Sequence, residues 1–384
     1  MKIPVTVPLC GEEEKALLAE VIDSGWLTQG SFVERFEQAV ASYLGVGHAV
    51  ATTSCTTAMH IALLLHGIGS GDEVILPSYT WIATANVVRM VGATPVFADI
   101  DLRTYNVTPE TIAERITHRT KALLPVHQMG MPLDVQAISQ LGRDHGLVTV
   151  EDAACGLGSR YIEEPVGASG NLACFSFHPR KVITTGEGGM IVTDDASLAE
   201  RARALTHHGA SISDVRKHQA GSLSTLLSEE FAEVGYNYRL TNLQGAVGLA
   251  QMSRLEDILI RRREIASRYN EQFAGMPYVI PPFVPSGAAP NWQTYALRIA
   301  EDSPVGRDQL AQDLLDAGIA CRPGLIACHR QPAYRGFEQH LPQTEQALRT
   351  VLTLPIYPQM TLEEQDYVVG MVRRSFSAVG AAKE

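Results

Sequence analysis

Short apolar runs alternate with amphipathic stretches from about residue 30 to residue 205, and this alternation predicts the fold class. Several of the runs are apolar throughout, as strands buried on both faces of a sheet require. The stretches between them, such as 57–66 and 133–142, have helical character. The predicted strands lie at 48–52, 73–76, 95–98, 121–126, 147–151, 173–177 and 190–193. We therefore expect an α/β fold with a mostly parallel seven-stranded sheet between helices.

The pattern changes after residue 206. The region 207–234 is polar and weakly periodic, and we expect a long surface excursion of the kind that forms lids. A helical run follows over 242–273, and then a proline-rich stretch at 276–290 that has the character of an inter-domain connection. We predict a large domain over 1–250, which includes the N-terminal segment. Residues 251–384 are expected to form a helical connection and a smaller C-terminal α/β domain.

Two local patterns predict finer detail. Ser31 and Glu34 have the spacing of a capping box that opens a helix, and Gly45 is placed to end it. The basic cluster Arg261, Arg262 and Arg263 lies in a stretch with apolar residues at helical spacing, so we expect a solvated outer face there.

Composition narrows the class of protein. The chain has 384 residues, 45% of them hydrophobic, and a formal net charge of −11. Such a chain can bury a large core, and its acidic balance argues against nucleic acid as a partner. Its six cysteines form no CxxC pair, which favours reduced thiols over a metal site and suggests a cytoplasmic location. The sequence shows no signal-peptide pattern and no apolar stretch of about 18 residues, so we expect no membrane span.

Candidate chemistry lies where the predicted strands end, which is where open α/β sheets bind ligands. Residues 53–57 (TSCTT) follow a strand and open a helix, and could bind an anion through backbone N–H groups or merely cap the helix. Asp152 ends a strand and could hold a pyridine nitrogen protonated, although many α/β enzymes have an acid there.

Two further residues belong to the same set. Lys181 lies between a predicted strand and the glycine-rich turn 186–189, where its amine could form a Schiff base or simply face solvent. Trp81 follows another strand and could stack on a flat ring or pack in the core. The glycine-rich turn lacks the spacing of a nucleotide-binding loop, and no GxGxxG follows the first strand, which disfavours a nicotinamide-dependent oxidoreductase.

The order of these features, together with long motifs, resembles the DegT/DnrJ/EryC1/StrS family of pyridoxal-phosphate (PLP) sugar aminotransferases, which have the aspartate-aminotransferase-like fold called fold type I. The resemblance extends nearly end to end. It is carried by SGWLTQGSFVERFEQAVASYLGV, GDEVILPSYTWIATANVV, VEDAACGLGS, FSFHPRKVITTGEGGMIVTDD, GYNYRLTNLQGAVGLAQ, HRQPAY and LPIYPQMT.

The resemblance implies a role for each matching residue. Lys181 is similar to the lysine that carries PLP covalently, and Asp152 to the partner of the pyridine nitrogen. The other cofactor contacts implied are Cys55, Thr56, Trp81, Cys155, Ser176 and Asn237, and the implied substrate contacts are His329 and Tyr334. In the family the asparagine reaches the neighbouring subunit, which implies a homodimer with shared active sites.

Two positions depart from the family pattern. Cys55 stands where the family usually has glycine, and it can serve if the contact is made by its backbone N–H. Cys155 stands where the family has glutamine or histidine near the cofactor's ring oxygen, and a thiol is a weaker hydrogen-bond donor.

The resemblance implies a ping-pong transamination in which the cofactor passes through pyridoxamine 5'-phosphate. Glutamate or glutamine would donate the amino group, and the acceptor would be the keto group of a nucleotide-linked deoxysugar. The alternatives are a cyclitol ketone as acceptor, a PLP-dependent sugar dehydratase, or a regulatory relative without turnover. The presence of Lys181 argues against the dehydratases, in which histidine replaces this lysine.

Overall fold

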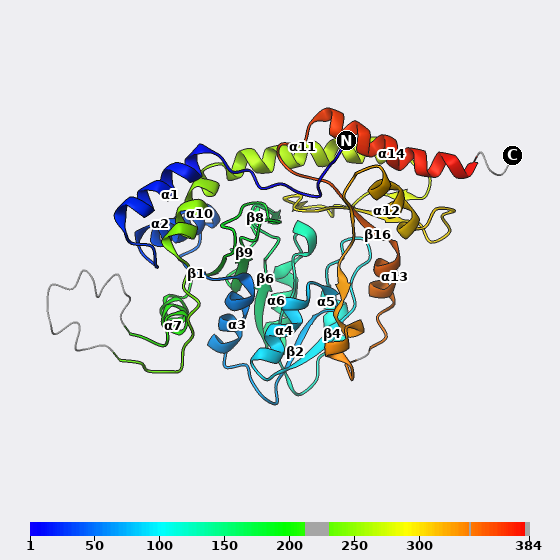
Figure 1. Ribbon diagram of the computed structural model, residues 1–384. Coiled ribbons are helices and arrows are strands. Elements are labelled where there is room, and N and C mark those ends of the chain that lie inside the picture. Colours follow the sequence, from blue (N-terminus) through cyan, green and yellow to red (C-terminus); the bar gives the residue numbers. More distant parts are fainter. Residues whose placement is uncertain (212–229, 338, 381–384) are drawn as a thin grey trace.

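The structure is a computed structural model that describes residues 1–211, 230–337 and 339–380. Its main feature is a seven-stranded sheet in the order β1-β10-β9-β6-β5-β2-β4 (Figure 1). Strand β10 is antiparallel to both of its neighbours, and the other pairings are parallel. In sheet order the strands are β1 (His48–Thr52), β10 (Gly189–Thr193), β9 (Leu172–Ser176), β6 (Val148–Asp152), β5 (Thr120–Leu123), β2 (Glu73–Pro77) and β4 (Thr94–Ala98).

All seven predicted strands are present, and the predicted fold class is confirmed. The largest difference in their bounds concerns the run 121–126, because β5 already ends at Leu123. Pro125 has no backbone N–H to donate to a neighbouring strand, so the regular ladder stops before it. An isolated bridge between Val126 and Asp152 continues the pairing beyond that point.

Helices cover both faces of this sheet because successive side chains of each strand point to opposite faces. Val50 and Leu76 pack on one face, whereas Ala49 and Ile75 pack on the other. The first face is covered by α3 (Cys55–Leu65), α4 (Ile82–Met90) and α7 (Ala196–Thr206). The second face is covered by α2 (Ser31–Leu44), α5 (Pro109–Ala113), α6 (Val135–Asp144) and the start of α11 (Leu255–Phe273).

A second sheet lies in the C-terminal part of the chain, in the order β11-β13-β16-β14. It shares a core with α11, with α12 (Arg307–Asp316) and with α14 (Leu362–Gly380). Ile3 belongs to this core and forms a bridge to Ile319, so the N-terminus lies with the C-terminal part (Figure 1). The strands are β11 (Val279–Ile280), β13 (Tyr295–Ile299), β16 (Val351–Leu354) and β14 (Arg322–Pro323). The domain boundary at residue 250 stays a prediction.

Further helices and short elements lie outside the two main sheets. Helix α10 (Asn242–Ser253) packs against both α1 (Glu12–Ser24) and α2. The remaining elements are α13 (Pro342–Thr350), the 3-10 turns η1 (Gln128–Gly130), η2 (Cys328–Arg330) and η3 (Pro332–Tyr334), and the short strands β3 (Tyr79–Thr80), β7 (Arg160–Tyr161), β8 (Glu164–Pro165), β12 (Ala288–Ala289) and β15 (Ile326–Ala327).

The predicted capping box at Ser31 is wrong. Gly30 is the N-cap of α2, and no side chain of the cap residue accepts a hydrogen bond. Instead, the N–H groups of Phe32 and Val33 donate to Asn242 Oδ1 at 3.1 and 3.3 Å. A buried side chain from a distant helix therefore caps α2. The prediction that Gly45 ends this helix is confirmed, because Gly45 is the C-cap of α2 with φ of 73°.

The expectation of a solvated basic cluster is wrong for Arg262, which is 1% exposed. It shares the buried face of α11 with Ile258 and Leu259, four and three residues earlier. The helical run predicted over 242–273 is divided at Arg254 into α10 and α11. Of the predicted surface excursion, residues 212–229 lie outside the described residues. None of the described helices is long and apolar enough to cross a membrane.

Candidate active site

The candidate site lies at the carboxyl ends of β6 and β9, and Lys181 is at its centre. Lys181 follows β9, and its Nζ donates to Cys155 Sγ at 3.1 Å. Burial lowers the pKa of Lys181, but Cys155, Cys55 and Asp152 together outweigh burial and raise it above its usual value. The lysine amine is therefore drawn into the protein, toward the other predicted residues, and the possibility of an ordinary surface lysine is excluded.

Asp152 is the last residue of β6, and its carboxylate is buried. Its Oδ2 accepts a hydrogen bond from Thr84 Oγ1 at 2.7 Å, and its Oδ1 accepts one from the Ala154 N–H at 3.1 Å. Burial raises the pKa of Asp152, and these hydrogen bonds and the charge of Lys181 oppose that rise only in part. The carboxyl group therefore holds a proton more tightly than a solvated aspartate does.

The N-terminus of α3 presents two unpaired donors. Ser54 is the N-cap and accepts from the Thr57 N–H, while the Ser54 N–H donates back to Thr57 Oγ1. Within the described part of the chain, the N–H groups of Cys55 and Thr56 make no hydrogen bond. Two free N–H groups at the positive end of a helix are suited to bind a phosphate. Gly189 lies directly beneath them, since a Cβ there would be 2.3 Å from the Ser54 carbonyl carbon.

A small pocket brings three predicted residues together. Ser176, Cys155 and Lys181 all line it. Its wall is fixed by Asn291, whose Nδ2 donates to the carbonyl groups of Cys155 and Leu157 at 2.6 and 2.8 Å. The Cys55 thiol donates to the Cys174 carbonyl at 3.3 Å, and the Cys55 backbone N–H makes no hydrogen bond to the described residues.

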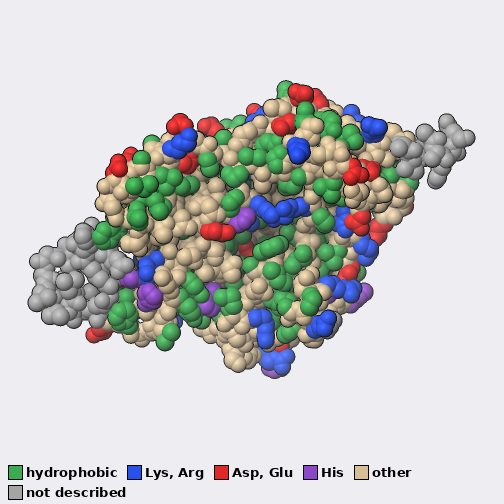
Figure 2. Space-filling view, viewed as in Figure 1, with side chains coloured by type: hydrophobic (Ala, Val, Ile, Leu, Met, Phe, Trp, Pro, Cys, Tyr) green, Lys and Arg blue, Asp and Glu red, His purple; other side chains and the backbone are tan. Residues whose placement is uncertain are grey.

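Trp81 is the N-cap of α4 and is 62% exposed. The prediction left open a core tryptophan, which this exposure excludes. A large indole in solvent next to a buried acid and lysine offers a free aromatic face for stacking. The face drawn in Figure 2 is hollowed between its upper and lower parts, and basic, acidic and histidine side chains gather in that hollow.

Comparison with known proteins decides the family. The sequence matches the DegT/DnrJ/EryC1/StrS aminotransferase family over residues 8–373. The chain belongs to this family. Its structure is also similar to that of TlmJ, an aminotransferase from Streptoalloteichus hindustanus, at 34% identity and a TM-score of 0.91, with 98% of this chain and 100% of TlmJ covered.

Two further solved structures are similar over nearly their whole length. The sugar aminotransferase CalS13 from Micromonospora echinospora is 27% identical, with a TM-score of 0.88 and coverage of 97% and 99%. Spr1654 from Streptococcus pneumoniae is 27% identical in its PMP form, with a TM-score of 0.90 and coverage of 98% and 100%, and it has also been solved in a PLP form. The DegT family uses PLP, and this member is an aminotransferase.

The residues of this DegT-family member fit the cofactor. The Lys181 amine can bond to the cofactor's aldehyde, and the buried acid Asp152 suits its pyridine nitrogen. The exposed indole of Trp81 suits its flat ring, and the two unpaired N–H groups of α3 suit its phosphate. The Cys155 thiol contacts the lysine amine, so the substitution of this family position by cysteine leaves the lysine in place.

Three predicted contacts make no hydrogen bond to this cluster. Asn237 is exposed and its side chain makes no hydrogen bond to the described residues. His329 is buried, and its Nδ1 and Nε2 are hydrogen-bonded to Ser78 Oγ at 2.6 Å and Glu345 Oε1 at 2.8 Å. Tyr334 is buried, and its hydroxyl donates to Asn86 Oδ1 at 2.7 Å.

The serine, histidine and glutamate around His329 resemble a hydrolase triad in their connectivity, but Ser78 is 0% exposed and cannot reach a substrate. Both ring nitrogens of His329 are used for packing the C-terminal part against β2 and β3. His329 and Tyr334 as substrate contacts stay predictions.

Sequence reasoning missed Thr84 and Asn291. Thr84 lies three residues after Trp81 in the first turn of α4, which was a usable signal, since that turn faces the strand ends. Asn291 directly follows the proline-rich stretch, more than 130 residues from the carbonyl groups it binds, and no local pattern could have marked it.

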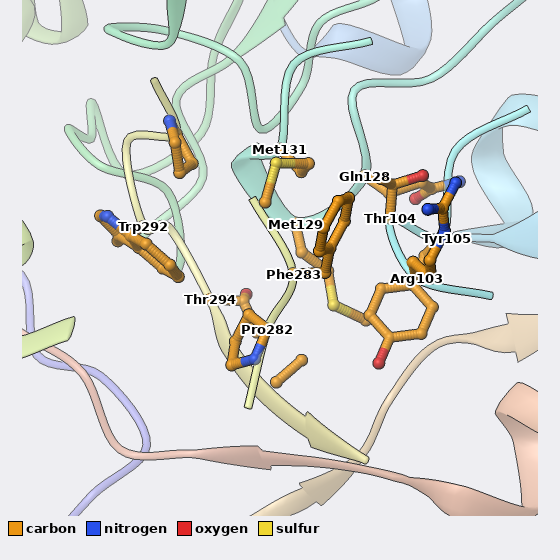
Figure 3. Close-up of a pocket in the computed structure, with 12 residues that line it drawn as sticks. Arg103, Thr104, Tyr105, Gln128, Met129, Met131, Pro282, Phe283, Trp292 and Thr294 are labelled. Carbon is orange, nitrogen blue, oxygen red and sulfur yellow. The ribbon is translucent and has the colours of Figure 1, made fainter. Parts of the chain in front are cut away.

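A separate apolar pocket lies beside the site (Figure 3). Trp292, Phe283, Met129 and Tyr105 line it, and Arg103 lies over the Phe283 ring at 4.9 Å. Tyr105, Met129 and Trp292 have positive φ values of 63°, 57° and 55°. Its walls connect to the candidate site, because Gln293, next to Trp292, donates to the carbonyl group of Arg180.

Proposed function

We propose that this aminotransferase moves an amino group from glutamate or glutamine to the keto group of a sugar, and that the sugar is nucleotide-linked. The observation that carries the proposal is the convergence of the Lys181 amine, the Asp152 carboxyl group and the free N–H groups of α3. The family and the sugar aminotransferase CalS13 support a sugar as the acceptor.

Each residue has a defined task in this proposal. PLP, when bound, supplies a ring that takes up the electron pair left when a C–H bond of the substrate breaks. Lys181 Nζ carries the cofactor covalently at rest and, once displaced by the donor's amine, takes up and returns the proton at the reacting carbon. Asp152 would keep the pyridine nitrogen protonated by pairing its carboxylate with that nitrogen, and the positive charge would oppose the burial that raises the Asp152 pKa in the protein alone.

The remaining residues orient and retain the cofactor. Cys55 and Thr56 bind its phosphate through their N–H groups, and the Ser176 hydroxyl adds a third donor. Trp81 would stack on the ring. This non-covalent anchorage would keep the cofactor in the site whenever Lys181 is not bonded to it.

Lys181→Ala tests the covalent bond. The purified wild-type protein with PLP is expected to absorb as a protonated Schiff base and to gain the mass of the cofactor after borohydride reduction. Lys181→Ala should lose both signals, whereas Lys121→Ala, at an exposed lysine of β5, should keep them. If Lys181→Ala still gained the mass of the cofactor after borohydride reduction, another lysine would carry the cofactor.

A substrate panel tests the acceptor. Release of 2-oxoglutarate from glutamate beyond one equivalent per active site should require a nucleotide-linked keto sugar. If turnover instead required an inosose, the acceptor would be a cyclitol ketone.

We further propose a homodimer in which Asn237 binds the cofactor phosphate of the partner subunit. Its exposed and unpaired side chain supports this assignment. Lys181→Ala and Asn237→Ala should each be inactive or weak alone. A mixed dimer of the two variants should regain about half the activity per dimer, because one of its two sites is intact. No recovery in a verified mixed dimer would place Asn237 in its own subunit's site.

A further inference from the structure

Cys155 differs from the other cysteines in what its sulfur contacts. Its Sγ accepts a hydrogen bond from the Lys181 amine at 3.1 Å. The thiols of Cys55, Cys321 and Cys328 instead donate to backbone carbonyl groups. Within the described residues, no other cysteine sulfur is hydrogen-bonded to a side-chain amine. The sulfur of Cys155 and the nitrogen of Lys181 therefore form a pair of reactive atoms.

The backbone on both sides of this pair is held in place. The Cys155 carbonyl accepts from Asn291 Nδ2 at 2.6 Å, and the Lys181 N–H donates to the His178 carbonyl at 2.8 Å. Two groups that are fixed beside each other react much faster with one another than the same groups free in solution. The fold thus favours a bond between this sulfur and this nitrogen.

The pair is also open to a small molecule. Cys155 and Lys181 are each half-buried and line one pocket together with Ser176. By contrast, Cys55 and Cys174 are buried. A thiol that reaches solvent and contacts an ammonium group has the surroundings of a cysteine that peroxide oxidises.

The contact also controls the charge of the lysine. Burial by itself lowers the pKa of Lys181, and Cys155 is foremost among the groups that raise it. Oxidation of the Cys155 thiol to a sulfenic acid removes the thiolate that holds the proton on the amine. The lysine is then closer to the unprotonated form, which is the nucleophilic one.

We propose that Cys155 is an oxidative modification site, at which peroxide leads to a covalent sulfur–nitrogen bond between Cys155 Sγ and Lys181 Nζ. In the first step the thiol is oxidised to a sulfenic acid by two electrons, and the peroxide is reduced to water. In the second step the amine attacks the sulfur. The S–O bond breaks, the S–N bond forms, and the hydroxyl group leaves as water with one hydrogen of the amine.

The bond uses the nitrogen to which the proposed function attaches PLP, and its effect on the cofactor rests on that proposal. It forms only while the Lys181 amine is free, so PLP bound beforehand should protect the protein. A thiol reductant returns the Cys155 thiol and the Lys181 amine and is itself oxidised to a disulfide. The modification is therefore a reversible block of cofactor attachment.

Peroxide treatment of the full-length protein without PLP tests the bond. Peptide mapping should find the peptides that contain Cys155 and Lys181 joined, at about 2 Da below their combined mass, because two hydrogen atoms are lost. Dithiothreitol should separate them. In Lys181→Met, which has no amine at this position, Cys155 should instead gain about 32 Da as a sulfinic acid that dithiothreitol does not reduce.

Cofactor attachment is the second readout. After removal of unbound PLP, the peroxide-treated wild type should lack the Schiff-base absorbance in proportion to its linked fraction, and dithiothreitol should restore it. Cys155→Ser should show this absorbance with or without peroxide. Cys10→Ser, at an exposed cysteine, is the matched control and should be blocked like the wild type.

Three results would overturn the proposal. They are a disulfide between Cys155 and Cys55, a sulfinic acid at Cys155 in the wild type without a link to Lys181, and an equal loss of the Schiff-base absorbance in Cys155→Ser and wild type after peroxide. An untreated wild type that shows no Schiff-base absorbance with PLP would instead refute the proposed function. The peptide link is measured without PLP, so the two failures are distinguishable.

Discussion

Adjacent residues of β6 show how strongly position sets acidity. Successive strand residues face opposite sides of the sheet. Glu151 accepts hydrogen bonds from His127, Ser169 and Asn171, and although its burial alone raises the pKa, these partners hold it below its usual value. Asp152 faces the site with fewer partners, so burial dominates and its pKa is raised. Glu151 is thus a structural anion, while Asp152 is suited to share a proton.

The raised pKa of Asp152 has a consequence for stability in the protein without cofactor. Ionisation is harder in the folded state, so the wild type should lose stability as the pH rises from the unfolded value of about 3.9 through the raised folded value. Asp152→Asn cannot ionise and should not show this loss. Its free energy of unfolding relative to wild type should therefore increase between pH 4 and pH 8 in urea titrations, while transamination is lost. A difference independent of pH would contradict the raised pKa.

At the scale of elements, the anion site depends on how closely β10 approaches the N-terminus of α3. A side chain at position 189 would clash with the start of α3, because its Cβ would lie within 2.5 Å of the Ser54 carbonyl group and the Cys55 nitrogen. This clash, and not an unusual backbone conformation, is why glycine is needed there. The two unpaired N–H groups are therefore positioned by the sheet beneath them.

Gly189→Ala should push α3 away from β10. We expect a loss of about 1–3 kcal/mol in unfolding free energy, typical of overpacking, and a weaker affinity for PLP measured by equilibrium dialysis. Gly370→Ala is the control, since no atom lies within 4 Å of a Cβ at that helical position, and it should be neutral or slightly stabilising. Unchanged PLP affinity in Gly189→Ala would separate the α3 N-terminus from the phosphate site.

At the scale of the whole molecule, α11 joins the two sheets. Its first residues pack on the large sheet, and its later residues belong to the core of the second sheet. Arg262 lies between these parts, and its Nη1 donates to the carbonyl groups of Trp292, Gln293 and Ile356 at 3.0, 3.4 and 3.4 Å. Burial lowers its pKa to about 10. One buried cation thus connects the helix to two separate chain segments, at 292–293 and at 356.

Arg262→Met should leave these carbonyl groups without their donor. The expected cost is about 2–4 kcal/mol in unfolding free energy, measured in urea, because methionine fills the volume but cannot donate. Arg263→Met, at the exposed neighbour, should change stability by no more than about 0.5 kcal/mol. Equal effects of the two substitutions would mean that the buried hydrogen bonds contribute little.

The sequence by itself determined the strands of the large sheet and the end of α2 at Gly45, and it predicted Lys181 and Asp152 as the candidate reactive residues. These features are encoded locally, by apolar runs, by a glycine that accepts positive φ, and by motifs of contiguous residues. The same local reasoning was wrong for Arg262, because a charged residue at a buried helical position is explained only by the carbonyl groups that distant segments bring to it.

The tertiary structure alone decided which groups meet. Asn242 caps α2 from more than 200 residues away, and Asn291 fixes the carbonyl of Cys155 from a distant part of the chain. Hydrogen bonds and charges act over a few ångströms in space whatever the separation along the chain. For that reason the order of residues predicts the reactive groups, and only the folded chain shows their hydrogen-bond partners.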